Sequence, residues 1–187
     1  MPSVDNVRTR VMSSEEQSRL DEAIRDCRNR LVGPTATLLT ETAMRASEPL
    51  EHARWRDVNW ERKLMSLKEA KGGRRDVPLS PKAIEALREL QSLAEAGSDD
   101  KVVAISYESL KAAWARACER AGVDNLRLHD LRHTAATRLA LKSGNVFLVK
   151  ALTGHRTMAR PLQGVADEGV HAVPVREAGH QSLRLSR

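Results

Sequence analysis

The sequence predicts an α+β fold that is mostly helical and contains one small three-stranded antiparallel sheet. Apolar residues recur at helical spacing in several segments, and one such stripe follows Ser80-Pro81. Its members are Ile84, Leu87, Leu90 and Leu93. Between residues 55 and 79 the pattern changes to short strand-like segments separated by turns. The length of 187 residues suits one domain with a hydrophobic core of its own.

Two helices are expected in the first fifty residues. Ser13 or Ser14 is suited to cap the first helix, over about 15–30, because acidic residues follow in its first turn, where the helix dipole favours them. Gly33-Pro34 is expected to interrupt the chain. A more apolar helix is then predicted from Thr35 to Glu48, ended by the proline that follows it.

The sheet is expected between Trp55 and Leu79, with strands at about 55–59, 63–68 and 74–79. Its turns are predicted at Asn59-Trp60-Glu61 and Lys71-Gly72-Gly73, where glycine supplies the positive φ angle.

Helices follow the sheet. They are predicted from Ser80-Pro81 onward, over 107–121, over 129–142 and, as a short helix, over 146–152. Gly122 and Ser143-Gly144 are placed to end two of them, because glycine readily adopts the left-handed conformation at a helix end.

Composition narrows the function classes. The formal net charge of +6 favours an anionic partner, of which nucleic acid is the most common. An aromatic content of 3% disfavours nucleic-acid modules that stack bases on aromatic rings. Cys27 and Cys118 have no metal-ligand spacing. No apolar run has the length of a membrane span, so we expect no membrane partner and a cytoplasmic protein.

Two arginines and three histidines form the most informative pattern in the chain. Arg45 stands three residues before Glu48, and the segment His129-Asp130-Leu131-Arg132-His133 is followed later by Gly154-His155. The three-residue step from His129 to Arg132 places both on one helix face. A guanidinium group donates two parallel hydrogen bonds to phosphate oxygens and keeps its charge. The pattern therefore predicts a site for a phosphodiester.

In this order the segments resemble the tyrosine recombinase (phage integrase) family, over about residues 14–172. The resemblance includes a lysine in a glycine turn, at Lys71-Gly72-Gly73, and the strand end Val77-Pro78-Leu79-Ser80. It implies the catalytic-domain fold of that family. It also implies site-specific recombination or integration of double-stranded DNA through a covalent phosphotyrosyl intermediate, without a metal or other cofactor.

The resemblance also implies roles for individual residues. Arg45 and Arg132 would hold the scissile phosphate, Lys71 would protonate the leaving 5′ oxygen, and His155 would bond a phosphate oxygen. His129 would assist proton transfer. The supporting residues would be Glu48 and His133.

The chain departs from the family at the nucleophile. The family tyrosine follows the Gly-His pair, and here it would fall near Leu162 or Gly164, neither of which can attack phosphorus. The only tyrosine, Tyr107, precedes His129 and is expected to be a partly buried aromatic at a helix start. The chemical step is therefore expected to be impaired.

The expected organisation is an irregular segment at 1–12, an integrase-like catalytic domain at 13–172 and an irregular tail at 173–187. The N-terminal core-binding domain of the family is expected to be absent. The tail lacks the apolar stripe with which family members dock on a neighbouring subunit, so a homo-oligomer on DNA is expected to be weakened.

Two other functions remain open from the sequence. The first is a catalytically inactive protein that occupies recombination sites without cutting them. The second is a metal-dependent hydrolase that uses His129 and His133, which are four residues apart on one helix face. Arg132 lies between these histidines and would repel a cation, and the sequence indicates no third ligand.

Overall fold

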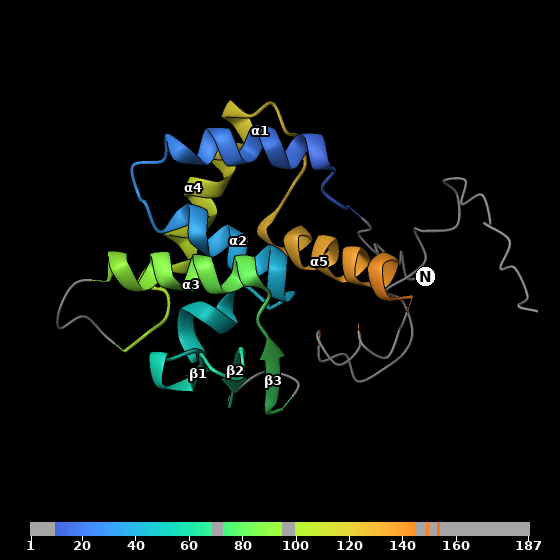
Figure 1. The fold of residues 1–187 in the computed structure, drawn as a ribbon. Coiled ribbons are helices and arrows are strands. Elements are labelled where there is room, and N and C mark those ends of the chain that lie inside the picture. The colour runs from blue at the N-terminus through green and yellow to red at the C-terminus, as the bar shows by residue number, and fades with distance from the viewer. Residues whose placement is uncertain (1–9, 69–72, 95–99, 145–148, 150–152, 154–187) are drawn as a thin grey trace, which may run out of the picture.

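The computed structural model describes residues 10–68, 73–94, 100–144, 149 and 153 (Figure 1). Its helices are α1 Ser14–Arg25, α2 Val32–Thr42, α3 Pro81–Leu93, α4 Tyr107–Arg120 and α5 Leu128–Ser143. Its strands are β1 Val58–Asn59, β2 Leu64–Leu67 and β3 Arg75–Pro78. Two short turns precede β1: the π-helical η1 Glu48–His52 and the 3₁₀-helical η2 Trp55–Asp57. The predicted mostly helical fold with one antiparallel sheet is confirmed.

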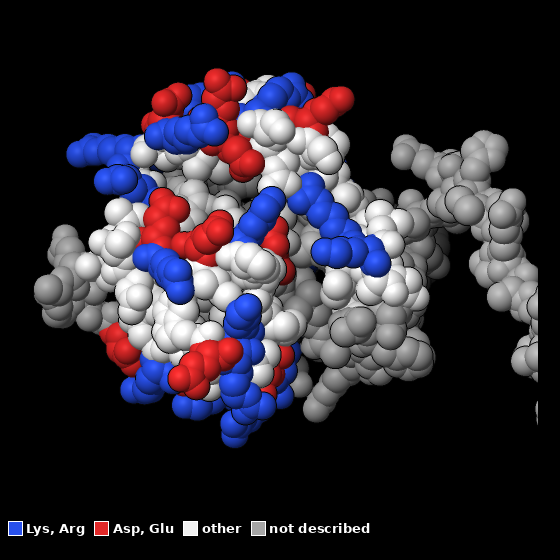
Figure 2. Space-filling model, in the orientation of Figure 1, with Lys and Arg blue, Asp and Glu red and all other residues white. Residues whose placement is uncertain are grey.

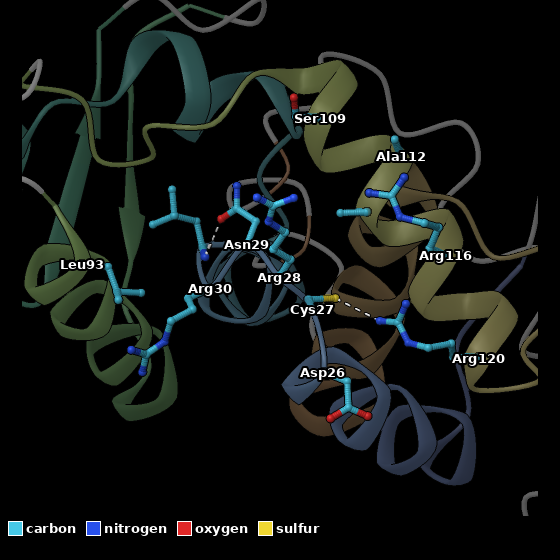
Figure 3. A pocket seen from close by; sticks show the side chains of 12 residues that line it. Asp26, Cys27, Arg28, Asn29, Arg30, Leu93, Ser109, Ala112, Arg116 and Arg120 are labelled. Atoms are coloured by element: carbon cyan, nitrogen blue, oxygen red, sulfur yellow. Dashed lines mark hydrogen bonds between the residues drawn. The ribbon is translucent and has the colours of Figure 1, made fainter.

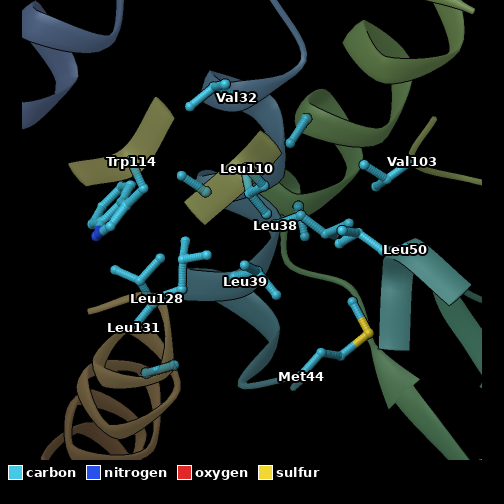
Figure 4. Close-up of a cluster of buried hydrophobic side chains, with 14 of the residues drawn as sticks. Val32, Leu38, Leu39, Met44, Leu50, Val103, Leu110, Trp114, Leu128 and Leu131 are labelled. Atoms are coloured by element: carbon cyan, nitrogen blue, oxygen red, sulfur yellow. The ribbon is translucent and has the colours of Figure 1, made fainter. Parts of the chain in front are cut away.

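Helix α2 lies at the centre of the molecule, between α1 and α4 on one side and α3 and the sheet on the other (Figure 1). Leu38 and Leu39 of this helix are fully buried. Figure 4 shows them in one cluster with Leu110 of α4 and Leu131 of α5. Complete burial of a leucine side chain contributes about 1.5–3 kcal/mol, so this cluster holds the helices around α2 in place.

The connection between α1 and α2 differs from the prediction. Helix α1 begins with a capping box between Ser13 and Glu16, but it ends at Arg25 rather than near residue 30. Gly33 and Pro34 do not interrupt the chain; they lie in the first turn of α2, where a proline needs no backbone N–H. A Cβ atom on Gly33 would lie 3.1 Å from the side chain of Ile24, so the glycine permits a close approach of the two helices.

Helix α2 ends at Thr42, and the predicted continuation to Glu48 was wrong. Ala43 adopts a left-handed conformation with φ of 52°. Two tertiary hydrogen bonds stabilise this early end: Arg132 donates to the carbonyl oxygen of Ala43, and the N–H of Arg45 donates to the carboxylate of Glu48. The segment 43–48 consists largely of good helix formers, but these contacts override the local propensity.

The sheet has the order β1-β2-β3, and both pairs of strands are antiparallel. Met65 lies opposite Val58 on one side and Val77 on the other, and all three side chains are buried. The predicted three strands are confirmed, but β1 is only two residues long because Trp55–Asp57 form a 3₁₀ turn.

The later helices begin and end close to the predicted positions. Ser80 caps α3 and Ser106 caps α4 with a side-chain oxygen. Gly122, just after α4, and Gly144, after α5, have left-handed φ angles of 59°, as expected for glycine at a helix end. Of the short helix predicted at 146–152, the structure describes Val149 alone, and it is helical.

The predicted tail at 173–187 and most of the predicted segment 1–12 lie outside the described residues. Within the described residues, no helix has the length and apolar character needed to cross a membrane.

Candidate active site

The carboxylate of Glu48 is the centre of the site. It accepts a hydrogen bond of 2.7 Å from the backbone N–H of Arg45 and one of 3.1 Å from the guanidinium group of the same residue. Arg75 of β3 donates two further hydrogen bonds, each of 2.8 Å, in a bidentate arrangement. Glu48 therefore joins the turn after α2 to the β-hairpin.

Arg75 was not among the residues that we expected in the site. Its side chain is 10% exposed, whereas that of Arg45 is 26% exposed. The sequence does contain a signal for it. Arg75 alternates with Val77 and Leu79, which face the core, so a charged residue stands on the buried face of a strand. Such a residue needs a charged partner, and Glu48 provides it.

Arg132 of α5 connects three separate segments of the chain. Its residue is 3% exposed. One Nη donates to the carbonyl oxygen of Ala43 at 2.6 Å, and the other donates to the carbonyl oxygen of Thr153. Thr153 directly precedes Gly154-His155 in the sequence. Arg132 thus ties the end of α2 to the residue before the second histidine motif.

The charges of the cluster act on one another. Burial would raise the pKa of Glu48, but the hydrogen bonds and charge of Arg75, followed by the N–H of Arg45, bring it below its ordinary value. Burial, and then the charge of Arg45, lowers the pKa of Arg132 to about 10, so the group stays protonated at neutral pH. Three guanidinium groups and one carboxylate leave the cluster positively charged.

His129 and His133 lie next to each other on α5. Their rings meet edge to face with centroids 5.0 Å apart. Partial burial of the ring lowers the pKa of His129, and the charges of His133 and Arg132 lower it further. His129 is therefore neutral at neutral pH and can accept a proton. The charge of Arg45 also lowers this pKa, and His129 lies three residues before Arg132 on α5.

The geometry around the histidines disfavours a metal centre. Asp130 does not face a shared ligand position, because its carboxylate accepts the N–H of Arg127 at 2.7 Å and caps α5. Among the described residues, no group of three or more histidine, cysteine, aspartate or glutamate side chains could hold a metal ion.

The structure thus brings together Arg45, Glu48, His129 and Arg132, and it adds Arg75. Lys71 and His155 lie outside the described residues, as do Leu162 and Gly164. By sequence order, Lys71 belongs to the connection between β2 and β3, whose strands are both described.

A cluster of this composition suits an anion held between guanidinium groups. The side chain of Arg45 is 26% exposed, and the neutral imidazole of His129 lies three residues before Arg132 on α5. Comparison with known proteins agrees with this chemistry. Residues 10–160 match the phage integrase family. The chain belongs to this family.

Two relatives show which proteins this phage integrase family member resembles in sequence. A shufflon-specific DNA recombinase of Escherichia coli is 35% identical over 159 residues, which cover 84% of this chain and 40% of the relative. A putative integrase/recombinase of Haemophilus influenzae is 36% identical over 120 residues, covering 64% of this chain and 32% of the relative. The chain therefore spans less than half the length of either protein.

Solved structures have the same fold. The crystal structure of XerA recombinase has a TM-score of 0.68 at 22% identity, and the match covers 80% of this chain and 57% of that one. A lambda integrase (75-356) dimer bound to a COC' core site also has a TM-score of 0.68, at 18% identity, covering 82% and 60% of the two chains. These similarities support the integrase catalytic-domain fold.

Proposed function

We propose that this phage integrase family member acts on double-stranded DNA in site-specific recombination or integration. The observation that carries the proposal is the convergence of Arg45 and Arg132, from distant parts of the chain, around the buried carboxylate of Glu48. The similarity to a shufflon-specific DNA recombinase and to a lambda integrase dimer bound to a COC' core site supports the same substrate class.

In the proposed mechanism, Arg45 and Arg132 bind the non-bridging oxygens of the scissile phosphate. Negative charge grows on these oxygens in the transition state, and donors that are already in place stabilise it by several kcal/mol. Glu48 orients Arg45, and Arg75 holds Glu48. The neutral imidazole of His129 can take a proton from the attacking hydroxyl group.

The remaining steps rest on the family resemblance. A tyrosine oxygen attacks phosphorus, the bond to the 5′ oxygen breaks, and Lys71 protonates that oxygen. His155 bonds a phosphate oxygen, and His133 supports the site. The bond energy is kept in the 3′-phosphotyrosyl linkage, so the reaction requires no metal or other cofactor. Such a protein acts on DNA in the prokaryotic cytosol, as a homo-oligomer on its target site.

The presence or absence of a nucleophile decides between two forms of this proposal: a recombinase that cuts DNA and a protein that only binds it. The sequence contains no tyrosine after His155, where the family carries it. Tyr107 lies at the start of α4 and lines a hollow together with Leu50, Glu51 and Ile105 rather than with the arginine cluster. We therefore propose that the chain as printed binds DNA without cutting it. This favours the alternative function, an inactive protein that occupies recombination sites.

A covalent-adduct assay tests this form of the proposal. The unaltered chain, incubated with nicked duplex DNA, is expected to give no product that survives denaturing electrophoresis. A tyrosine at the family spacing, introduced as Leu162→Tyr or as Gly164→Tyr, is expected to produce an adduct, because the arginine cluster is arranged to receive a nucleophile at the phosphate. Adding Arg45→Ala to the adduct-forming variant should abolish the adduct.

The outcomes separate the alternatives. An adduct with the unaltered chain would show that another residue attacks the phosphate. DNA binding without an adduct in every variant would leave only the binding function. If neither DNA binding nor an adduct is seen, the proposal is wrong.

A further inference from the structure

A groove of mixed charge runs over α2, between α1 and α3. It consists of three adjoining hollows of about 300, 430 and 830 Å³. Asp21, Thr37 and Glu89 line both the first and the second hollow, whereas Cys27 and Arg30 line both the second and the third. The three hollows are therefore neighbours, and we call them together the α2 groove.

One end of the α2 groove is strongly basic. Its guanidinium groups belong to Arg28, Arg30, Arg116 and Arg120. Arg120 donates to the carbonyl oxygen of Ala23 at 2.9 Å. The other three arginines make no hydrogen bond or ion pair within the part of the chain that the structure describes.

Figure 3 shows how these side chains lie. Arg116 projects from α4 toward Arg28, which comes from the connection between α1 and α2, whereas the carboxylate of Asp26 points away from the hollow. Guanidinium groups that are gathered without a carboxylate among them attract an anionic group strongly.

The same end has an apolar floor. It is made of small and aliphatic side chains: Leu31, Leu93, Ala112 and Ala113. Ala112 and Ala113 precede Arg116 on α4 by four and three residues, so both lie beside it on the helix surface. A ligand that fills this hollow therefore brings an aliphatic group as well as a negative charge.

The other end of the α2 groove is acidic. Its carboxylates belong to Asp21, Glu41, Glu85 and Glu89, with Lys82 as the single basic residue. Glu41 accepts a hydrogen bond of 2.7 Å from the hydroxyl of Ser80. Acidic side chains gather on this face beside basic ones (Figure 2). The two ends therefore prefer ligands of opposite charge.

The basic end is separate from the candidate active site. It lies at the N-terminal end of α2, whereas Arg45 follows the C-terminal end. A helix of 11 residues is about 16 Å long, and the acidic end of the groove lines the same helix. A DNA duplex that follows the groove would be repelled by these carboxylates. A short oligophosphate would bind only the arginines and leave the apolar floor uncovered. Neither ligand therefore matches the whole groove.

We propose that the α2 groove is a docking site for a segment of a partner protein whose acidic and basic residues form two separate blocks with an aliphatic side chain between them. The acidic block pairs with Arg28 and Arg116, the aliphatic group covers Ala112 and Ala113, and the basic block reaches Glu85 and its neighbours. Such complementarity fixes the direction of the bound segment and rejects uniformly charged ligands.

The test uses the full chain and fluorescently labelled synthetic peptides. The first peptide has a block of lysines, two central leucines and a block of glutamates; the second has the same composition with alternating charges. Anisotropy titrations at low salt are expected to show binding of the block peptide that is about tenfold tighter, because only its charges match both ends. The double variant Arg28→Glu/Arg116→Glu should lose this preference, and Glu85→Lys/Glu89→Lys should reduce it.

Arg62→Glu is the matched control, because Arg62 is an exposed arginine in the turn between β1 and β2. It should leave peptide binding unchanged. Duplex DNA binding by the Arg28→Glu/Arg116→Glu variant should persist, which separates this test from that of the proposed function.

Three results would overturn the proposal. Equal binding of the two peptides would exclude recognition of the blocks. Tighter binding of inorganic triphosphate or of an all-glutamate peptide, lost in the same double variant, would assign the basic end to a simple anion. Concentration-dependent self-association in sedimentation, abolished by that variant, would make a second copy of the chain the occupant.

Discussion

At the scale of single residues, Glu48 decides the geometry of the candidate active site. Its carboxylate is almost fully buried and accepts hydrogen bonds from two arginines. Ionised groups are costly to bury unless every charge is paired, so the removal of one partner affects the others. Arg45 and Arg75 depend on this one side chain.

Replacement of Glu48 by glutamine should destabilise the fold. The amide would direct an NH₂ group at Arg45 or Arg75, and the guanidinium groups would lose their counter-charge. We expect the free energy of unfolding, measured by urea denaturation, to fall by about 3 kcal/mol, which is the lower end of the range for breaking a buried ion pair. Glu51→Gln is the control, because Glu51 is exposed; its substitution should change stability little.

The same carboxylate predicts a dependence of stability on pH. The pKa of Glu48 in the folded state is lowered from 4.5. A lowered pKa stabilises the fold at pH values above the unfolded pKa, and this contribution disappears as the pH falls through the folded pKa. Urea denaturation between pH 7 and pH 3 should show wild type losing stability below about pH 4.5, and Glu48→Gln should lose less. Parallel profiles would contradict this role of Glu48.

At the scale of elements, a bidentate ion pair joins the β-hairpin to the turn after α2, in addition to the buried apolar side chains Met65 and Val77. Arg75 of β3 contacts Glu48 of η1, which directly follows the turn that carries Arg45. Lys71 belongs to the same hairpin by sequence. This pair therefore helps to position the hairpin relative to Arg45.

Arg75→Lys should loosen the hairpin. Lysine keeps the positive charge but cannot form two parallel hydrogen bonds with one carboxylate. Hydrogen exchange of the amide of Leu79, which bonds the carbonyl oxygen of Lys63, should become faster. Arg74→Lys is the control, because Arg74 is exposed and directly precedes β3. Equal exchange in both variants would argue against the ion pair as the attachment.

The turn between β1 and β2 offers a stabilising substitution. Lys63 is exposed and has a left-handed φ of 53°. A residue with a Cβ atom pays about 1–2 kcal/mol for this conformation, which exceeds the entropic cost of glycine. Lys63→Gly should therefore raise the free energy of unfolding by about 0.5–1 kcal/mol. Arg62→Gly, which lacks a positive φ, should lower it; a loss of stability in both variants would refute the argument.

At the scale of the whole molecule, the fold places the charged side chains in two separate regions, the arginine cluster and the α2 groove. Under the proposed function, the net charge of +6 would attract DNA without selecting a contact point, and the arginine cluster would supply one. The α2 groove carries both signs of charge over another face of the molecule. Affinity for DNA and affinity for a protein partner are thus expected to depend on different residues.

Binding to duplex DNA should fall steeply with added salt, because phosphate contacts release counterions. Anisotropy titrations between about 50 and 200 mM salt should show this decline. Arg45→Ala should weaken binding more than Arg88→Ala, since Arg88 is exposed on α3. Arg45 is preferred to Arg132 for this test because Arg132 also holds Ala43 and Thr153. Equal effects, or affinity that is insensitive to salt, would count against the DNA site.

The sequence by itself determined the fold class, most helix starts and the family. Ser13 and Ser80 were recognisable at helix starts because a cap is a local interaction between near neighbours in the chain. The family resemblance came from the order of the motifs along the chain, which are Arg45 with Glu48, Lys71 in its glycine turn, His129 to His133, and Gly154-His155.

Only the tertiary structure decided where α2 ends and which groups surround Glu48. Local propensity favours a helix through residue 48, but the hydrogen bond from Arg132 to Ala43, 89 residues apart, makes the early end favourable. The role of Arg75 likewise depends on a contact over 27 residues. Such contacts exist only after the chain has folded, because their free energy comes from groups that the backbone brings together in a buried environment.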